Sequence, residues 1–120
     1  MTDYGWLDHY LLSMPGAEKD FKEEWGWDRY MVRGKLYAAF VRDMDPPLLT
    51  LKLEPAKGEF YRGQYPAVIP GYYMNKAHWN SVRLDGTVPE DLLCEMMDES
   101  HRLVLASLPK KVQAQIAAMG

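Results

Sequence analysis

A segment in the second half of the chain concentrates side chains that could bind an anion or stack on a ring. Residues 70–86 begin with Pro-Gly and end with Asp-Gly, two dipeptides typical of loops and turns. Between them lie cations, amides and aromatic rings at a density that a plain connector does not need. Lysine and arginine neutralise phosphates, and flat rings stack on nucleobases. The candidate binding residues of this segment are Tyr72, Asn75, Lys76, His78, Trp79, Asn80 and Arg83.

Three further cations extend this candidate surface. Lys52 belongs to an alternating strand pattern, and Arg33 and Lys35 flank Gly34 at an expected hairpin tip of the glycine-first kind. Together with the rings, these cations could present a small surface that binds anions and bases, with the hairpin tip as a candidate wing. The whole chain has a net charge of −3, which excludes a generally basic nucleic-acid-binding protein but not a local basic surface.

Two other interpretations of the same residues stay open. In a structural interpretation, Trp79 fills the core, His78 pins the loop by a hydrogen bond, and Asn75 supports a turn. Lys76 and Arg83 are harder to place in a core. In a second interpretation, the rings form a protein interface or a small-ligand pocket. The rings that would form it are Tyr61, Tyr65, Tyr72, Tyr73 and Trp79.

The sequence offers little for catalysis or for a metal. No serine lies in a Gly-x-Ser-x-Gly elbow, and there is no glycine-rich phosphate loop. His9, His78 and His101 match no short ligand spacing. The single cysteine, Cys94, falls in an apolar helical pattern and has no partner for a disulfide within the chain. We therefore expect no enzymatic activity, no cofactor and no metal.

The elements that position these residues can be predicted from hydrophobic periodicity. Apolar residues at helical spacing predict a first helix that ends at Pro15 and Gly16. Residues 49–53 alternate cleanly and predict a strand with one face in water. Residues 58–65 are ambiguous and predict at most one helical turn. Further strands are expected near residues 21–25, 29–33, 36–42 and 79–84. The largely apolar strand 36–42 should be buried on both faces. In the last strand, residues 79, 81 and 83 should lie on one face and residues 80, 82 and 84 on the other.

Two helices complete the expected order. An apolar stripe from Leu92 to Leu108 predicts a long helix with Glu99 on its solvent side, and Pro109 starts a final short helix. Helix, antiparallel strands and two helices make an α+β two-layer sandwich, with the helices packed on one face of the sheet, in one domain over residues 1–120. No apolar run could span a bilayer and no signal peptide pattern opens the chain. We expect a cytoplasmic protein, with no membrane partner, and favour a monomer.

Several motifs carry a family resemblance. They are Met14-Pro15-Gly16-Ala17-Glu18 after the first expected helix, residues 74–79 and 82–86, and Leu108-Pro109 near the end. Together they resemble the MmcQ/YjbR family over almost the whole chain. The resemblance implies a frataxin-like (CyaY-like) fold, a double-wing motif and DNA binding, and it implies no enzymatic role. Frataxin-like iron binding does not carry over, because the first expected helix offers only Asp3 and Asp8 as oxygen ligands.

Overall fold

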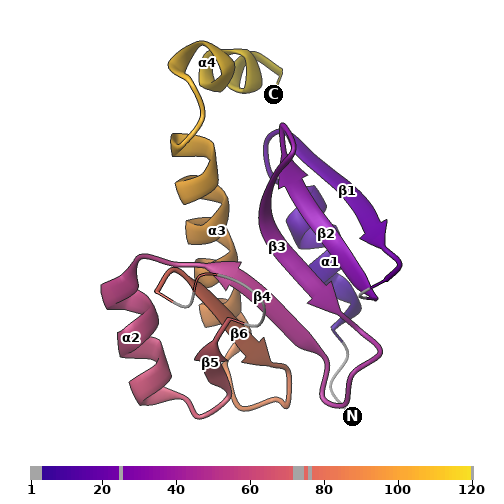
Figure 1. Ribbon diagram of the computed structural model, residues 1–120, viewed down its shortest axis with the longest axis vertical. Coiled ribbons are helices and arrows are strands. Elements are labelled where there is room, and N and C mark those ends of the chain that lie inside the picture. Colours follow the sequence, from indigo (N-terminus) through magenta and orange to yellow (C-terminus); the bar gives the residue numbers. More distant parts are fainter. Residues whose placement is uncertain (1–3, 25, 72–74, 76, 120) are drawn as a thin grey trace.

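A six-stranded antiparallel sheet and four helices make up the part of the chain that the computed structural model describes, residues 4–24, 26–71, 75 and 77–119 (Figure 1). The strands lie side by side in the order β1-β2-β3-β4-β6-β5. This arrangement confirms the predicted α+β class. The elements are α1 (Gly5–Leu12), β1 (Ala17–Lys22), β2 (Trp27–Val32), β3 (Lys35–Val41), β4 (Leu48–Lys52), α2 (Pro55–Gln64), β5 (Val68–Pro70), β6 (Trp79–Arg83), α3 (Glu90–Ala106) and α4 (Lys110–Met119).

The two faces of the sheet have different surroundings. Figure 1 shows α1 and α3 behind the strands, and the main core lies between these helices and the sheet. Leu51 of β4 and Val82 of β6 belong to this core together with Met96 of α3. Side chains alternate between the faces of a strand, so Thr50 and Ser81 point to the other face. We call this second face, which α1 and α3 do not cover, the open face.

The central strand β3 is buried on both faces, as its continuous apolar sequence predicts. The pairing of β2 with β3 shifts register beside Tyr37, which is typical of a bulge that redirects a side chain. The Tyr37 hydroxyl donates a hydrogen bond to the Leu11 carbonyl of α1 at 2.7 Å. Its ring meets the His101 ring of α3 edge to face. Tyr37 therefore joins both helices to the sheet.

Residues 55–64 form a ten-residue helix, α2, where the sequence predicted at most one turn. The expected order of elements therefore gains a helix between β4 and β5. Pro55 suits the first helical turn, where its missing N–H costs nothing. Gly58 is the only residue of α2 that is buried. An apolar stripe is thus absent from α2, which is why periodicity did not reveal it.

Two strand predictions need correction. The first strand covers Ala17–Lys22 rather than residues 21–25, because it pairs with β2 along its whole length. The tip of the next hairpin is Arg33 and Gly34 rather than Gly34 and Lys35. The φ angles of Arg33 and Gly34 are 51° and 79°, so both residues adopt the left-handed conformation of a type I′ turn. Such a turn matches the twist of the flanking strands, and Lys35 becomes the first residue of β3.

The expected wet face of β4 is also wrong. Thr50 is 1% exposed and Ser81 is fully buried. Their hydroxyl oxygens lie 2.9 Å apart in a hydrogen bond across the two strands. Leu48 belongs to a second, smaller cluster on the open face, together with Trp27, Ala39 and Val41. Of the β4 side chains on the open face, that of Lys52 is partly exposed.

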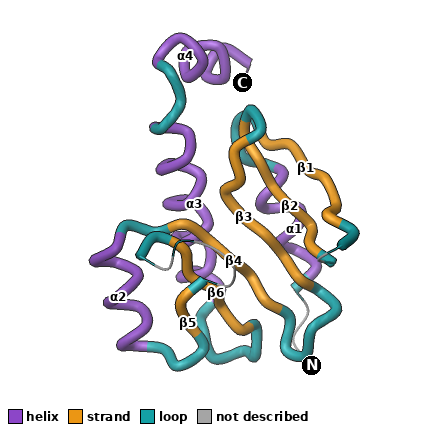
Figure 2. Tube along the Cα trace, in the orientation of Figure 1, coloured by secondary structure: helices purple, strands orange, loops and turns teal. Residues whose placement is uncertain are grey.

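The last helix, α4, lies beyond the end of α3, at one end of the molecule (Figure 2). Ile116 is 1% exposed and anchors α4 in the main core. A Cβ placed on Gly16 would lie 3.2 Å from side-chain atoms of both Ile116 and Val32. The α1–β1 turn, the end of β2 and α4 therefore pack closely together.

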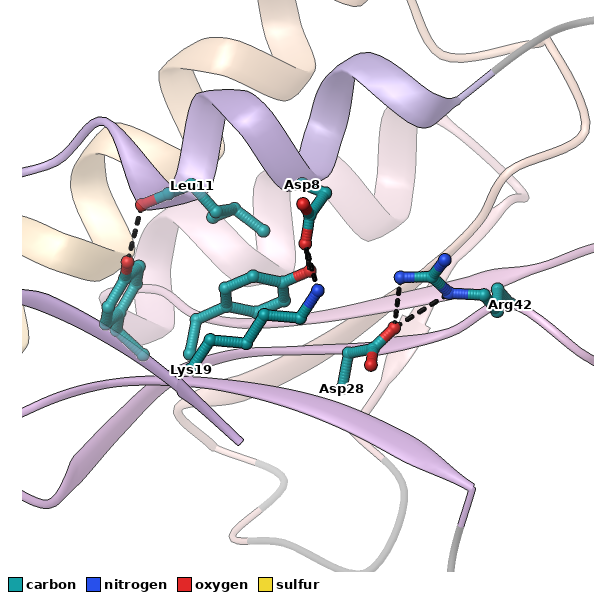
Figure 3. Close-up of polar contacts among 7 residues, drawn as sticks. Asp8, Leu11, Lys19, Asp28 and Arg42 are labelled. Carbon is teal, nitrogen blue, oxygen red and sulfur yellow. Dashed lines mark hydrogen bonds and ion pairs between the residues drawn. The ribbon is translucent and has the colours of Figure 1, made fainter. Parts of the chain in front are cut away.

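An ion pair between α1 and β1 predicts a loss of stability in acid. Burial raises the pKa of Asp8, but hydrogen bonds from Lys19 and Tyr30 outweigh burial and hold the pKa below its ordinary value of 3.8 (Figure 3). A carboxylate whose pKa is lower in the folded state stabilises the fold above pH 3.8, and this contribution disappears as the pH falls through the folded pKa. We expect Asp8→Asn to lower the free energy of unfolding at pH 7 and to flatten its dependence on pH below about 4.

Denaturant unfolding at neutral pH and near pH 3 measures this effect. Asp43→Asn is the control, because Asp43 is exposed and forms no ion pair among the described residues. Equal dependence on pH in wild type and Asp8→Asn would contradict the prediction.

Candidate nucleic-acid interface

The candidate interface begins where β4 ends and β6 starts. Lys52, the last residue of β4, is paired with Trp79, the first residue of β6. Both side chains are half-buried and belong to the open face. Arg83 is exposed on the same face at the other end of β6, about 13 Å from Trp79 at the usual rise of a strand. The sheet thus brings one ring and two cations onto one face.

The turn before β6 sets the position of Trp79. The Asn75 carbonyl accepts hydrogen bonds from the backbone N–H groups of His78 at 3.3 Å and Trp79 at 2.8 Å. The Asn75 side-chain oxygen also accepts the N–H of Ala77 at 2.9 Å. The His78 carbonyl accepts the N–H of Leu53 at 2.7 Å, which ties the turn to the end of β4. The Asn75 side chain therefore supports the turn, as the structural interpretation predicted, and His78 takes part through its backbone groups.

Helix α3 supports the same end of β4 from behind. The Ser100 hydroxyl accepts the Lys52 N–H at 2.8 Å and donates to the Tyr37 carbonyl. The last pair between β3 and β4 is Ala38 with Leu51, so the two strands separate at this point. Ser100 fills the gap in the backbone hydrogen bonding and thereby holds the backbone of Lys52.

Glu99 is buried, contrary to its predicted place on the solvent side of α3. It is 8% exposed. Its carboxylate accepts the Glu54 N–H at 3.3 Å and forms an ion pair with Lys57 of α2. The hydrogen bond to Glu99 raises the pKa of Lys57. The sequence could not show this position, because the helix that covers Glu99 was itself not predicted.

Asn80 does not reach the surface, which corrects its place among the candidate binding residues. It is fully buried. Its side-chain oxygen accepts a hydrogen bond from Arg62 of α2. A Cβ on Gly58 would lie 2.8 Å from the Asn80 amide nitrogen, so α2 sits directly on this side chain. Asn80 holds α2 against β6 and leaves its neighbour Trp79 to face outward.

Cations on the surface fall into two groups. Six of them form ion pairs with carboxylates: Lys19, Lys22, Arg29, Arg42, Lys57 and Arg102. The candidate cations that the structure describes belong to the other group. Within the described part of the chain, no ion pair neutralises Arg33, Lys35, Lys52 or Arg83. Arg83 lies near enough to Asp85 for its charge to contribute to the lowered pKa of that carboxyl, but the two residues form no ion pair.

The candidate residues do not form one continuous site. Arg33 and Lys35 are exposed at the β2–β3 tip, which extends past the last pair between β3 and β4. They lie beyond the point where β3 separates from β4, the neighbouring strand that ends at Lys52. Trp79, on β6, is two strands away from β3 in the sheet order. Tyr72 and Lys76 lie outside the described residues. Of the rings expected in a protein or ligand site, Tyr61, Tyr65 and Trp79 are half-buried, and Tyr73 also lies outside the described residues.

Sequence reasoning missed two exposed cations, Lys110 and Lys111, at the start of α4. The pattern that could have revealed them is a pair of lysines directly after Pro109, in a helix that contains no acidic residue. Among the described residues, no group of three histidine, cysteine or acidic side chains is placed to hold a metal. In the same part of the chain, no helix combines the length and the apolar character that crossing a membrane requires.

The fold and surface define a two-layer α+β protein with helices on one face of an antiparallel sheet and unpaired cations on the other. A family model for YjbR matches residues 12–103. The chain belongs to the YjbR family, which confirms the resemblance seen in its motifs.

Two relatives and one solved structure illustrate this membership, and a second solved structure shares the fold. YjbR of Escherichia coli K12 is 31% identical over 105 residues, 88% of this chain and 89% of that protein. YbdF of Escherichia coli O157:H7 is 32% identical over 90 residues, 75% and 74% of the two chains. The crystal structure of Deinococcus radiodurans protein DR2400 has a TM-score of 0.87 at 32% identity and covers 92% of this chain and 85% of that one. A Pseudomonas syringae protein with a TM-score of 0.70 at 20% identity, covering 86% and 99%, shares the fold alone.

Proposed function

We propose that this protein is a non-enzymatic DNA-binding module that contacts DNA through the open face at Lys52, Trp79 and Arg83. The observation that carries the proposal is the division of the described cations: six form ion pairs with carboxylates, whereas Lys52, Arg83 and the two hairpin-tip cations form none. Arg83 has only a longer-range attraction to Asp85. A free cation can release counterions from a phosphate backbone, but a neutralised one gains much less. The net charge of −3 makes the contact local and the affinity modest.

The half-buried Trp79 ring favours a single strand over a duplex. Bases of a single strand are free to stack on an aromatic side chain, whereas bases of a duplex are already stacked. Lys52 is directly opposite Trp79, and Arg83 follows along the same strand of the sheet. A strand that runs along β6 would therefore place its phosphates near the two cations and one base near the ring.

The test is a titration of labelled single-stranded and duplex DNA at low salt. We expect Lys52→Gln/Arg83→Gln to weaken binding at least about tenfold and to reduce the salt slope by about 1.4 for single strands, since each phosphate contact contributes about 0.7. Trp79→Leu should weaken single-strand binding more than duplex binding, because only the stacking contribution is removed.

A matched control lies on the same face. Lys22→Gln/Arg29→Gln removes the same charge from β1 and β2, but both cations are already paired, with Glu24 and Asp20. We expect this control to bind nearly as wild type does. No binding by the wild type at micromolar concentrations, or equal losses in the two double variants, would refute the DNA-binding proposal.

The alternative, a protein-interaction or small-ligand-binding domain, has its own supporting observation. Phe60 of α2 is 61% exposed and meets the half-buried Tyr61 ring edge to face. Tyr61 also lines a polar pocket of about 290 Å³ between α2 and α3, whose other lining residues are Lys57, Glu95, Asp98, Glu99 and Arg102. An exposed ring beside a charged pocket suits a protein or a small polar ligand. Wild-type protein that fails to bind DNA would favour this alternative.

A further inference from the structure

The C-terminal helix α4 carries its positive charges at its N-terminal end, where they are least favourable. Lys110 and Lys111 begin the helix and are both exposed. The first turn contains no acidic residue and the last turn no basic one. The N-terminal end of a helix is the positive end of its dipole, so two cations there are unfavourable. Because no described carboxylate pairs with either lysine, helix stability does not account for them.

Packing brings α4 to the β2–β3 hairpin. A Cβ placed on Gly16 would lie 3.2 Å from a side-chain atom of Ile116 in α4 and 3.2 Å from one of Val32 in β2. Val32 directly precedes the hairpin tip with Arg33, and Lys35 follows the tip. Figure 1 shows α4 and this tip at the same end of the long axis of the molecule. Four cations without a described carboxylate partner therefore gather at one end.

We propose that Lys110 and Lys111, together with Arg33 and Lys35, form a second phosphate-contacting surface, the basic end, for the DNA strand that binds the open face. The inference rests on the proposed function and extends it. The four side chains supply charge but no ring, so their contacts go to phosphates rather than to bases. The molecule is 40 Å long, and the basic end lies at one end of that axis. A strand that touches both surfaces must run from Trp79 on β6 past β4 and β3 to α4.

The experiment compares wild type with Lys110→Gln/Lys111→Gln on single-stranded oligonucleotides of about 6 and about 20 nucleotides, one within and one beyond the range of common binding-site sizes. On the longer strand we expect roughly tenfold weaker binding at low salt and a salt slope smaller by up to about 1.4. On the shorter strand we expect a smaller change, because fewer of its phosphates can lie near α4 while one base stays on Trp79. The charge-preserving variant Lys110→Arg/Lys111→Arg should bind both strands as wild type does.

A thermal melt separates a binding effect from a folding effect. Removing two cations from the positive end of the helix dipole should leave the melting temperature unchanged or raise it. Weaker binding by a protein that is at least as stable supports the basic end. An unchanged slope on the longer strand overturns it, and the DNA-binding proposal then still stands or falls on the Lys52→Gln/Arg83→Gln result. Wild-type protein that binds neither strand overturns both.

Discussion

Gly71→Ala should destabilise the fold by about 3 kcal/mol, because an added methyl group has no room to fit without moving backbone. A Cβ on Gly71 would lie 2.7 Å from the Trp79 Cβ and 2.8 Å from the Trp79 carbonyl carbon. The Gly71 N–H also donates to the Trp79 carbonyl at 2.7 Å, so the two segments cannot separate without losing that bond. Replacing glycine restricts the unfolded chain and gains about 0.4–1 kcal/mol, which is smaller than the clash.

Denaturant unfolding and a thermal melt measure this loss, and we expect the melting temperature to fall by roughly 10 °C. Gly63→Ala is a matched control with the opposite sign. Gly63 is in α2 with nothing within 4 Å of an added Cβ, so alanine should stabilise the helix by up to about 1 kcal/mol. A Gly71→Ala protein as stable as wild type would show that the approach of Gly71 to Trp79 is not tight.

The same substitution should also weaken DNA binding if the open face carries it, because Trp79 starts β6 and its position depends on Gly71. Binding is measured at a temperature at which the variant remains folded. Loss of stability without any loss of binding would separate the two effects and place the DNA contact elsewhere.

Ser100→Ala should cost about 3 kcal/mol, because it leaves two backbone groups without partners, each worth roughly 1–3 kcal/mol when buried. The Ser100 hydroxyl is fully buried and serves the Tyr37 carbonyl and the Lys52 N–H at once. Alanine fills nearly the same space, so the loss comes from hydrogen bonding rather than from a cavity.

Equilibrium unfolding in urea gives the free energy directly. Ser107→Ala is the control, since the Ser107 hydroxyl bonds the Val104 carbonyl at an exposed helix end where water can replace it. That control should change stability by less than about 0.5 kcal/mol. Similar values for the two serine variants would mean that Ser100 does not bridge the strands.

Local patterns were enough for much of the fold. The apolar run of β3 predicted a strand buried on both faces, and residues 37–41 are buried. Alternation placed Trp79, Ser81 and Arg83 on the face opposite Asn80 and Val82, and the strand pairings agree. These predictions succeed because side chains alternate between the two faces of a strand. The pattern of apolar residues along a few adjacent positions therefore shows whether one face or both faces are buried.

Contacts between distant segments decided the rest of the candidate site. The helical pattern of α3 places Glu99 on the solvent side, but α2 covers it in the fold. Helix α2 could not be predicted from periodicity because it has no apolar stripe. Asn80 sits among candidate binding residues in the sequence, but Arg62 and Gly58 enclose its amide in the fold. Thr50 belongs to a strand that should be half wet, but its hydroxyl meets Ser81 and is buried.

The sequence by itself determined the class of fold, the family and the presence of cations and rings in residues 70–86. Tertiary structure alone decided which cations stay unpaired, because an ion pair depends on how close two side chains come in space. Arg29 and Arg83 look alike in sequence, but the antiparallel pairing of β1 with β2 sets Asp20 opposite Arg29, whereas Leu48 lies opposite Arg83. For that physical reason Arg29 forms an ion pair, whereas Arg83 has only a longer-range attraction to Asp85.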